Sequence, residues 1–144
     1  MANIRIECVP VKPFALGWFG FDHLQLVFEP DCAGQPVPQD DWFVLEGSSG
    51  SLGRKGAAPT LTVLGADGRT TLAAANHAAS SALVRRIGTP TSRGSHILPV
   101  ACDPDDAWQA MSACARAINE AGLPYRLFGV PGTPYPSITS SSIV

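Results

Sequence analysis

The segment 22–29, which reads Asp-His-Leu-Gln-Leu-Val-Phe-Glu, constrains the fold more than any other part of the chain. Three apolar side chains alternate along it with His23, Gln25, Val27 and Glu29. A period of two residues is that of a β-strand, in which successive side chains point to opposite faces of the sheet. The segment therefore predicts a strand that turns one face toward an apolar core.

Other segments carry weaker strand patterns. In residues 3–9 apolar side chains alternate with Arg5 and Glu7, which predicts a half-buried strand with the two charged residues on its polar face. Residues 47–56 hold four glycines and are predicted to form a loop. Further strands are predicted over residues 42–46, 60–64 and 95–100, with 123–129 as an additional candidate.

Two helices are predicted in the second half of the chain. Thr70 or Thr71 can cap a helix that runs to about Ile87, because apolar residues recur there at spacings of three and four. Asp103 is an N-cap followed by proline at the first helical position, and Gly122 marks the end of this second helix. Its apolar stripe comprises Trp108, Met111, Ala115 and Ile118.

Strands that precede helices favour an α+β fold, an antiparallel sheet with two or three helices packed on it. Hydrophobic residues make up 45% of the 144 residues and charged residues 15%, a composition that can form a core. We expect a single domain over residues 1–144. No apolar run approaches the roughly 20 residues that cross a bilayer, so no membrane association is expected.

The charge of the chain excludes one class of partner. Ten Lys and Arg against twelve Asp and Glu give a net charge of −2. The chain therefore lacks the excess of basic residues that is typical of a nucleic-acid-binding protein. The N-terminus has no basic start followed by an apolar stretch, so no Sec signal is expected. We therefore expect the protein in the cytoplasm, or exported by a dedicated secretion system.

The cysteines and histidines give no sign of a metal or another cofactor. The cysteines have no CxxC spacing, and we expect reduced, mostly buried thiols. His77 and His96 have no ligand partner at metal spacing. His23 is the best candidate for a general base, since a rigid strand can hold it beside a nucleophile; its alternative is an ordinary, partly exposed strand histidine. The cysteines are Cys8, Cys32, Cys102 and Cys114.

Residues 117–129 read Ala-Ile-Asn-Glu-Ala-Gly-Leu-Pro-Tyr-Arg-Leu-Phe-Gly, and residues 139–144 read Thr-Ser-Ser-Ser-Ile-Val. Together they resemble the part of circularly permuted NlpC-type papain-like proteins in which a helix and an extended segment lead to the nucleophile motif. In that family the histidine comes earlier on a strand, as in residues 22–28, and a following strand, here residues 42–47, supplies further site groups. The resemblance implies a permuted papain-like fold.

The resemblance also implies site residues. Ser140 matches the nucleophile, His23 the base, and Glu46 or Gln25 the group that orients the imidazole, with Gln25 and Trp42 as substrate-binding residues. A nucleophile at a helix N-terminus gains from the helix dipole and from nearby backbone N–H groups. The sequence departs from the family because Ser140 replaces a cysteine and because the sequence ends at Val144, before the next helix. An introduced Cys→Ser change, a natural serine variant and a tail that only resembles the motif all remain open.

A cysteine could be the nucleophile instead, with the catalytic residues in a different order along the sequence. Cys32, followed by His77 or His96 and then Asn119, has the order of unpermuted papain-like enzymes, although it lies in a Pro-rich connector. For Cys8, Cys102 and Cys114 a place in the core is the preferred interpretation.

The leading hypothesis is a papain-like amidohydrolase, active or inactivated by serine at position 140, that acts on bacterial cell-wall peptides. Its partners would be a peptide or cell-wall amide substrate and, as for an interbacterial toxin, an immunity or secretion protein. The alternative is a non-catalytic interaction module that uses aromatic and proline residues around 13–21 and 30–42. A small-ligand pocket is a third hypothesis that the sequence does not separate from these.

Overall fold

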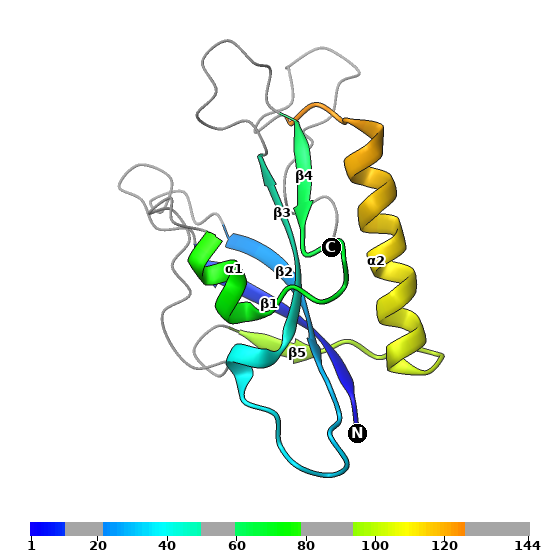
Figure 1. Cartoon of the computed structure of the whole chain (residues 1–144). Coiled ribbons are helices and arrows are strands. Elements are labelled where there is room, and N and C mark those ends of the chain that lie inside the picture. Colours follow the sequence, from blue (N-terminus) through cyan, green and yellow to red (C-terminus); the bar gives the residue numbers. More distant parts are fainter. Residues whose placement is uncertain (11–21, 50–59, 79–93, 126–144) are drawn as a thin grey trace.

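The computed structural model describes residues 1–10, 22–49, 60–78 and 94–125, and in this part of the chain it has an α+β architecture (Figure 1). Five strands form one antiparallel sheet in the order β4-β3-β2-β1-β5. The predicted antiparallel sheet with helices packed on it is confirmed. The elements are β1 (Asn3–Pro10), β2 (Asp22–Glu29), the 3₁₀ turn η2 (Gln39–Asp41), β3 (Phe43–Ser49), β4 (Leu61–Leu64), α1 (Leu72–Ala78), β5 (Ser95–Ile97) and α2 (Pro104–Ala121).

Element ends differ from the predictions where pairing outweighs local composition. β3 extends through Ser49, because Gly47 pairs with Val63 and Ser49 with Leu61 of β4, so the prediction of a loop from Gly47 was wrong at its start. β5 ends at Ile97 rather than at residue 100. Pairing with β4 sets the length of β3. In contrast, β5 ends close to Pro99, which has no backbone N–H, although the Leu98 N–H still donates to the Ile4 carbonyl oxygen of β1 at 2.8 Å.

The helix ends follow their predicted caps. The Thr71 hydroxyl accepts a hydrogen bond from the Ala74 N–H at 3.2 Å at the start of α1, and the predicted continuation beyond residue 78 lies outside the described residues. In α2, the Asp103 carboxylate accepts from the Asp105 N–H at 2.9 Å, and Gly122 has the left-handed conformation of a C-terminal cap.

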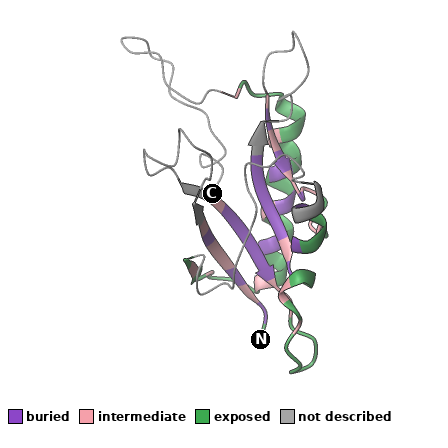
Figure 2. Cartoon of the chain, turned by 90° about the vertical axis from the view of Figure 1, so that its left-hand side faces the viewer, coloured by how far each residue is buried: buried purple, intermediate pink, exposed green. Residues whose placement is uncertain are grey.

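One face of the sheet packs against α2 and is called the α2 face (Figure 1). Its centre is an aromatic stack, in which the Phe28 ring lies 5.5 Å from Trp108 and 6.2 Å from Phe43 between ring centroids. The predicted stripe of α2 is confirmed, since Trp108 and Ala115 are buried here and its other two members pack against the same cluster. The outer side of α2 is exposed (Figure 2).

The opposite face of the sheet is called the α1 face, because α1 packs on it at β3. Its apolar cluster consists of Val27, Trp42, Val44, Leu72 and Ala75. The prediction that residues 3–9 form a half-buried strand was wrong at one position of its polar side, because Arg5 on this side is partly exposed but Glu7 is buried. Glu7, on that side, is 0% exposed.

A short turn after β4 connects the two faces. Gly65 has φ +81°, and a Cβ at this position would overlap the backbone carbonyl oxygen of Val44, so only glycine fits. Trp108 of α2 donates its indole N–H to the carbonyl oxygen of Gly68 at 2.9 Å. The chain then passes along β3, where the Leu72 N–H donates to the Trp42 carbonyl oxygen at 2.8 Å, and enters α1. The turn thereby links α2 to the start of α1 beside β3.

The outer edge of β4 is closed by a side chain of α2. The Val63 N–H donates to Asn119 Oδ1 at 2.6 Å, and Asn119 Nδ2 donates to the Val63 carbonyl oxygen at 3.0 Å. The Leu61 N–H donates to the Leu123 carbonyl oxygen at 2.7 Å. These bonds satisfy backbone groups that an open edge strand would offer to another chain.

Neither helix in the described ranges combines the length and the apolar character needed to span a bilayer.

Candidate functional site

Four polar residues lie side by side across four neighbouring strands. In the register of the sheet, Ser95 of β5 is opposite Glu7 of β1, Glu7 is opposite Gln25 of β2, and Gln25 is opposite Glu46 of β3. Residues directly opposite one another in an antiparallel sheet share a face. We call Ser95, Glu7, Gln25 and Glu46 the polar row. It lies on the α1 face, next to Val27 and Val44 of the apolar cluster.

Three members of the polar row are deeply buried. Glu7 and Gln25 are 0% exposed and Glu46 is 5% exposed. Gln25 donates a hydrogen bond from Nε2 to Glu7 Oε2 at 2.7 Å. Removing a carboxylate from water costs several kcal/mol before its partners are counted, and apolar residues would fill this position more cheaply. A buried polar group that the fold does not require is a reason to look for function at that place.

Ser95 adds an unsatisfied hydroxyl to the end of the row. Its Oγ is buried and has no hydrogen-bond partner, the one such side-chain atom in the described ranges. A buried hydroxyl without a partner costs about 1–3 kcal/mol. Glu7 and Ser95 were both missed in the sequence, since only strand register brings them beside Gln25. The one available signal was Glu7, a charged residue within a segment of strand pattern.

His23 lies on the same strand as the middle of the row. It belongs to β2, where it pairs with Val9 of β1, and it precedes Gln25 by two residues. Two residues along a strand span about 7 Å, so the backbone of His23 is next to the row. The side chain of His23 and all of Ser140 lie outside the described part of the chain. The structure therefore brings together Gln25, Glu46 and the strand position of His23.

Trp42 lies away from the row, beyond the start of β3. It is 6% exposed, and its indole N–H donates to the Val37 carbonyl oxygen at 3.0 Å. The Arg5 guanidinium lies over its ring, 5.5 Å from the centroid, and Arg5 also pairs with Glu29 at 2.9 Å. These contacts place Trp42 in the core of the α1 face. Trp42 therefore does not contribute to the aromatic and proline surface that was suggested for residues 30–42.

The alternative relay of Cys32, His96 and Asn119 is contradicted by the fold. β5, which carries His96, and β4, beside which Asn119 lies, are at opposite edges of the sheet. Four strand spacings separate them by about 19 Å. The amide of Asn119 is also bonded to the Val63 backbone, and the side chain of His77 lies outside the described residues.

The cysteines are free, but the prediction that they are mostly buried was wrong. Cys32, Cys102 and Cys114 are exposed, and Cys8 is intermediate. Cys32 lies in the β2–β3 connector, where a tight turn places it at the surface, and Cys102 precedes the cap of α2. Cys114 is on α2 one residue before buried Ala115, so the helical period turns it toward the rim of the core. A core position for Cys102 and Cys114 is thereby excluded.

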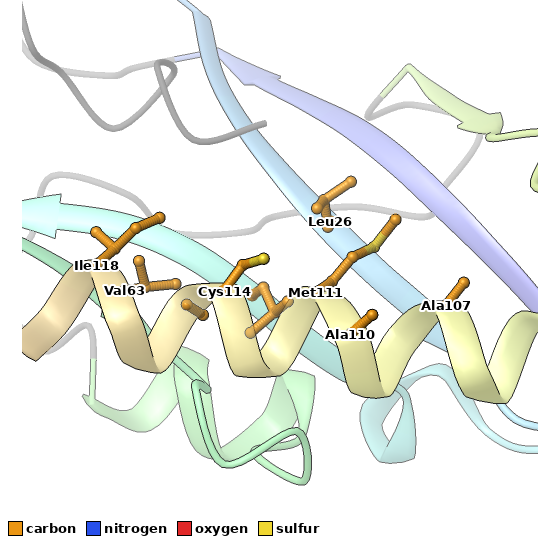
Figure 3. Close-up of a pocket in the computed structure, with 9 residues that line it drawn as sticks. Leu26, Val63, Ala107, Ala110, Met111, Cys114 and Ile118 are labelled. Carbon is orange, nitrogen blue, oxygen red and sulfur yellow. The ribbon is translucent and has the colours of Figure 1, made fainter.

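A second feature lies on the α2 face. An apolar groove of about 350 Å³ runs between α2 and the sheet. Met111, Cys114 and Ile118 of α2 and Leu26 of β2 project into it (Figure 3). Its lining provides no acid, base or hydrogen-bonding cluster, so the groove offers shape and apolar surface rather than chemistry.

Within the described ranges, no group of three or more His, Cys, Asp and Glu side chains is arranged to hold an ion. Two exposed carboxyls away from the row have lowered pKa values. The N-terminal ammonium, which is 2.8 Å from Asp31, lowers the pKa of that carboxyl. The hydrogen bond from the Arg69 backbone N–H, followed by those from Thr70, lowers the pKa of Asp67.

Comparisons with protein-family models, with curated proteins and with solved structures gave no match to this chain.

Proposed function

We propose that the protein is a papain-like amidohydrolase in which His23 is the general base and residue 140 the nucleophile. One observation supports this most. Gln25 and Glu46, the two residues expected to orient the imidazole, are opposite each other across β2 and β3, both are buried, and His23 is two residues from Gln25. An orienting group must itself be held rigidly, and a buried cross-strand pair meets that need.

The proposed reaction needs a proton relay. His23 removes the proton of residue 140 as its oxygen, or sulfur in a cysteine form, attacks the amide carbonyl carbon. The C–N bond then breaks, the imidazolium gives its proton to the leaving amine, and an acyl-enzyme remains. Water attacks the acyl carbon with His23 again as base, which releases the acid and restores residue 140. Gln25 and Glu46 are assigned to orienting His23, because neither is exposed to a substrate.

The proposed substrates are bacterial cell-wall peptides, and the proposed partners are an immunity protein or a component of a secretion system. This part follows from the resemblance of residues 117–129 and 139–144 to the permuted papain-like family. Its test is hydrolysis of purified stem peptides, followed by mass spectrometry of the products.

A substrate-independent experiment tests the relay. Exposed Cys32, Cys102 and Cys114 are first changed to serine, because they would also react with an alkylating reagent. In this background, Ser140→Cys is treated with iodoacetamide between pH 5 and pH 9, with and without His23→Ala. A thiolate paired with an imidazolium reacts below the ordinary thiol pKa of about 8.5. We expect rapid alkylation of position 140 near pH 6 that His23→Ala abolishes.

Two results would contradict the relay. One is an alkylation rate at position 140 that follows an ordinary thiol titration, and the other is a rate that is the same with and without His23→Ala. Stem-peptide hydrolysis by Ser140→Cys that His23→Ala removes would extend the assignment to the substrate class.

The groove on the α2 face favours a second candidate, a non-catalytic module that binds an apolar segment of a partner. Under this function, Met111→Glu in the groove would abolish partner binding, whereas His23→Ala would leave it unchanged. If alkylation and hydrolysis instead depend on His23 and are unchanged by Met111→Glu, the amidohydrolase is supported.

A further inference from the structure

We propose that the outer edge of β5 pairs with the same edge of a second copy of this chain, so that two sheets join into one across a two-fold axis. The pairing involves neither the proposed nucleophile nor the proposed base, and it goes beyond the proposed function without depending on it. What carries it is a difference between the two edges of the sheet, because one edge is covered and the other offers backbone groups to a further strand.

The edge at β4 is closed by residues of the same chain. Asn119 and Leu123 bind the outer backbone groups of β4. β5 lies at the opposite end of the sheet order, where its inner side pairs with β1. Within the described ranges, no residue is hydrogen-bonded to the outer side of β5. β5 therefore presents an edge that another strand can extend.

The hydrogen bonds between β1 and β5 determine which backbone groups point outward. The Leu98 N–H donates to the Ile4 carbonyl oxygen at 2.8 Å, and the Gly94 carbonyl oxygen accepts from β1 at 3.3 Å. Along an antiparallel strand, residues alternately direct their backbone groups toward the partner strand and away from it. Ser95 and Ile97 therefore direct both the N–H and the carbonyl oxygen away from β1.

The residues of β5 do not protect this edge. Natural sheets protect a free edge with charged side chains, proline, a bulge or a covering segment. Residues 95–97 read Ser-His-Ile, with no proline and no acidic, Lys or Arg side chain. Ile97 is 56% exposed, and the chain after it turns inward, since Leu98 and Val100 pack against the core of the α2 face. The edge thus combines outward backbone groups with an exposed apolar side chain.

A second β5 fits this edge because the edge is complementary to itself. When two antiparallel copies are centred on His96, Ser95 of each copy is opposite the partner subunit's Ile97, and each of these pairs exchanges both backbone hydrogen bonds. The neighbouring strand also shields Ile97 from water. A register centred on Ile97 would instead direct the ring of Pro99, which has no N–H, against the partner strand. The register centred on His96 is therefore the one that we assign.

The first experiment measures the mass of the unsubstituted protein in solution. Three residues of each copy form the pairing, so the interface is small and we expect a weak dimer. Sedimentation equilibrium between about 10 μM and 1 mM should show a mass that rises toward twice that of one chain. A monomer throughout this range would overturn the proposal, including the case in which another segment of the same chain occupies the edge.

A backbone substitution tests whether this edge forms the dimer. Ile97→Pro removes an outward N–H and leaves the hydrogen bonds to β1 in place. Each copy loses this donor, and the ring obstructs the pairing, so the dimer dissociation constant should rise by at least about 30-fold. Ile97→Val, which keeps the N–H and the branched side chain, is the matched control and should change it less than about threefold. An unchanged dissociation constant in folded Ile97→Pro would contradict the proposal.

A disulfide tests the register and does not depend on the folding of the proline variant. The three exposed cysteines are first changed to serine, as in the alkylation experiment. Opposed residues between the bonded pairs have Cα atoms about 4.5 Å apart, within disulfide range. His96→Cys should therefore cross-link to the second copy when it is oxidised with glutathione disulfide. In Ile97→Cys the two thiols are diagonal, with Cα atoms about 7–8 Å apart, so cross-linking should be at least about tenfold slower.

Non-reducing gels read out this comparison, and the parent protein, which keeps only Cys8, gives the background. Cross-linking of His96→Cys at the rate of the parent, or more slowly than Ile97→Cys, would show that the copies do not pair through β5 in this register and would overturn the proposal.

Discussion

The two faces of the sheet are built on different principles. The α2 face has the composition of an ordinary core, with a stack of Phe28, Phe43 and Trp108 and the apolar stripe of a well-capped helix. The α1 face combines a smaller apolar cluster with two buried carboxylates and a buried amide. The strands are shared, so the same β2 gives Leu26 to one face and Gln25 to the other.

This difference separates what stabilises the fold from what can perform chemistry. Burial of apolar area on the α2 face contributes stability in proportion to that area. The polar row contributes little net stability, because its hydrogen bonds mainly offset the cost of desolvation. Substitutions on the α2 face should therefore change stability more than substitutions in the polar row. Five predictions test this comparison, in order of decreasing effect.

The largest effect is expected on the α2 face. Trp108→Ala removes the stacked ring and the hydrogen bond to Gly68, and should lower the free energy of unfolding by about 3–5 kcal/mol. Urea unfolding measures this, with exposed Gln109→Ala as the control within about 0.5 kcal/mol. A loss below about 1 kcal/mol would show that α2 is not the main support of the sheet.

Neighbouring residues of β2 allow a direct comparison of the faces. Gln25→Leu removes the hydrogen bond that Gln25 Nε2 donates to the buried Glu7 carboxylate, and should cost about 1.5–3 kcal/mol of unfolding free energy. Leu26→Met, a change of similar volume on the α2 face, should cost less than about 1.5 kcal/mol. Thermal and urea unfolding compare the two, and a stabilised Gln25→Leu would contradict a structural use of this hydrogen bond.

The edge of β4 should be weakened by a change in α2. Asn119→Ala removes both hydrogen bonds to the Val63 backbone and should cost about 1–2 kcal/mol. Hydrogen exchange at the Val63 amide should accelerate, while that at buried Val27, in the centre of the sheet, should change only with global stability. Glu120→Ala, at the next residue of α2, serves as the control.

Removal of the hydroxyl at the end of the polar row should stabilise the protein, whereas the substitutions above destabilise it. Ser95→Ala removes a buried oxygen that has no partner among the described residues, and should raise the free energy of unfolding by about 1 kcal/mol. Differential scanning calorimetry measures this change. A lower free energy of unfolding in Ser95→Ala would mean that the hydroxyl makes a hydrogen bond in solution.

The smallest effect is expected in the turn that connects the faces. The pKa of Asp67 is lowered from 3.8 in the folded protein, so its contribution to stability is present above that value and is lost as the pH falls through the folded pKa. Asp67→Asn should therefore destabilise the protein at pH 6 by less than about 0.5 kcal/mol, because the carboxylate is exposed. The difference from the unsubstituted protein should vanish in strong acid, and a constant difference across pH would contradict the assignment.

Much of the fold was readable in the sequence because the signals are local. The alternation in 22–29, the cap Asp103-Pro104 and the stop at Gly122 each depend on a few neighbouring residues, and β2 and α2 follow them. The extension of β3 into Gly47 was missed, because pairing with β4 is a long-range contact. The burial of Glu7 was missed because one strand does not reveal whether its second face is covered.

Of the candidate site, the sequence by itself determined His23, Gln25 and Glu46 as polar residues in or beside strands, since residue type and period are properties of the chain. Only the tertiary structure decided that Gln25 meets both Glu7 and Glu46, that Trp42 belongs to the core, and that Asn119 closes an edge. The physical reason is strand register: a shift of one residue moves every side chain to the other face, and register is set by contacts between distant segments.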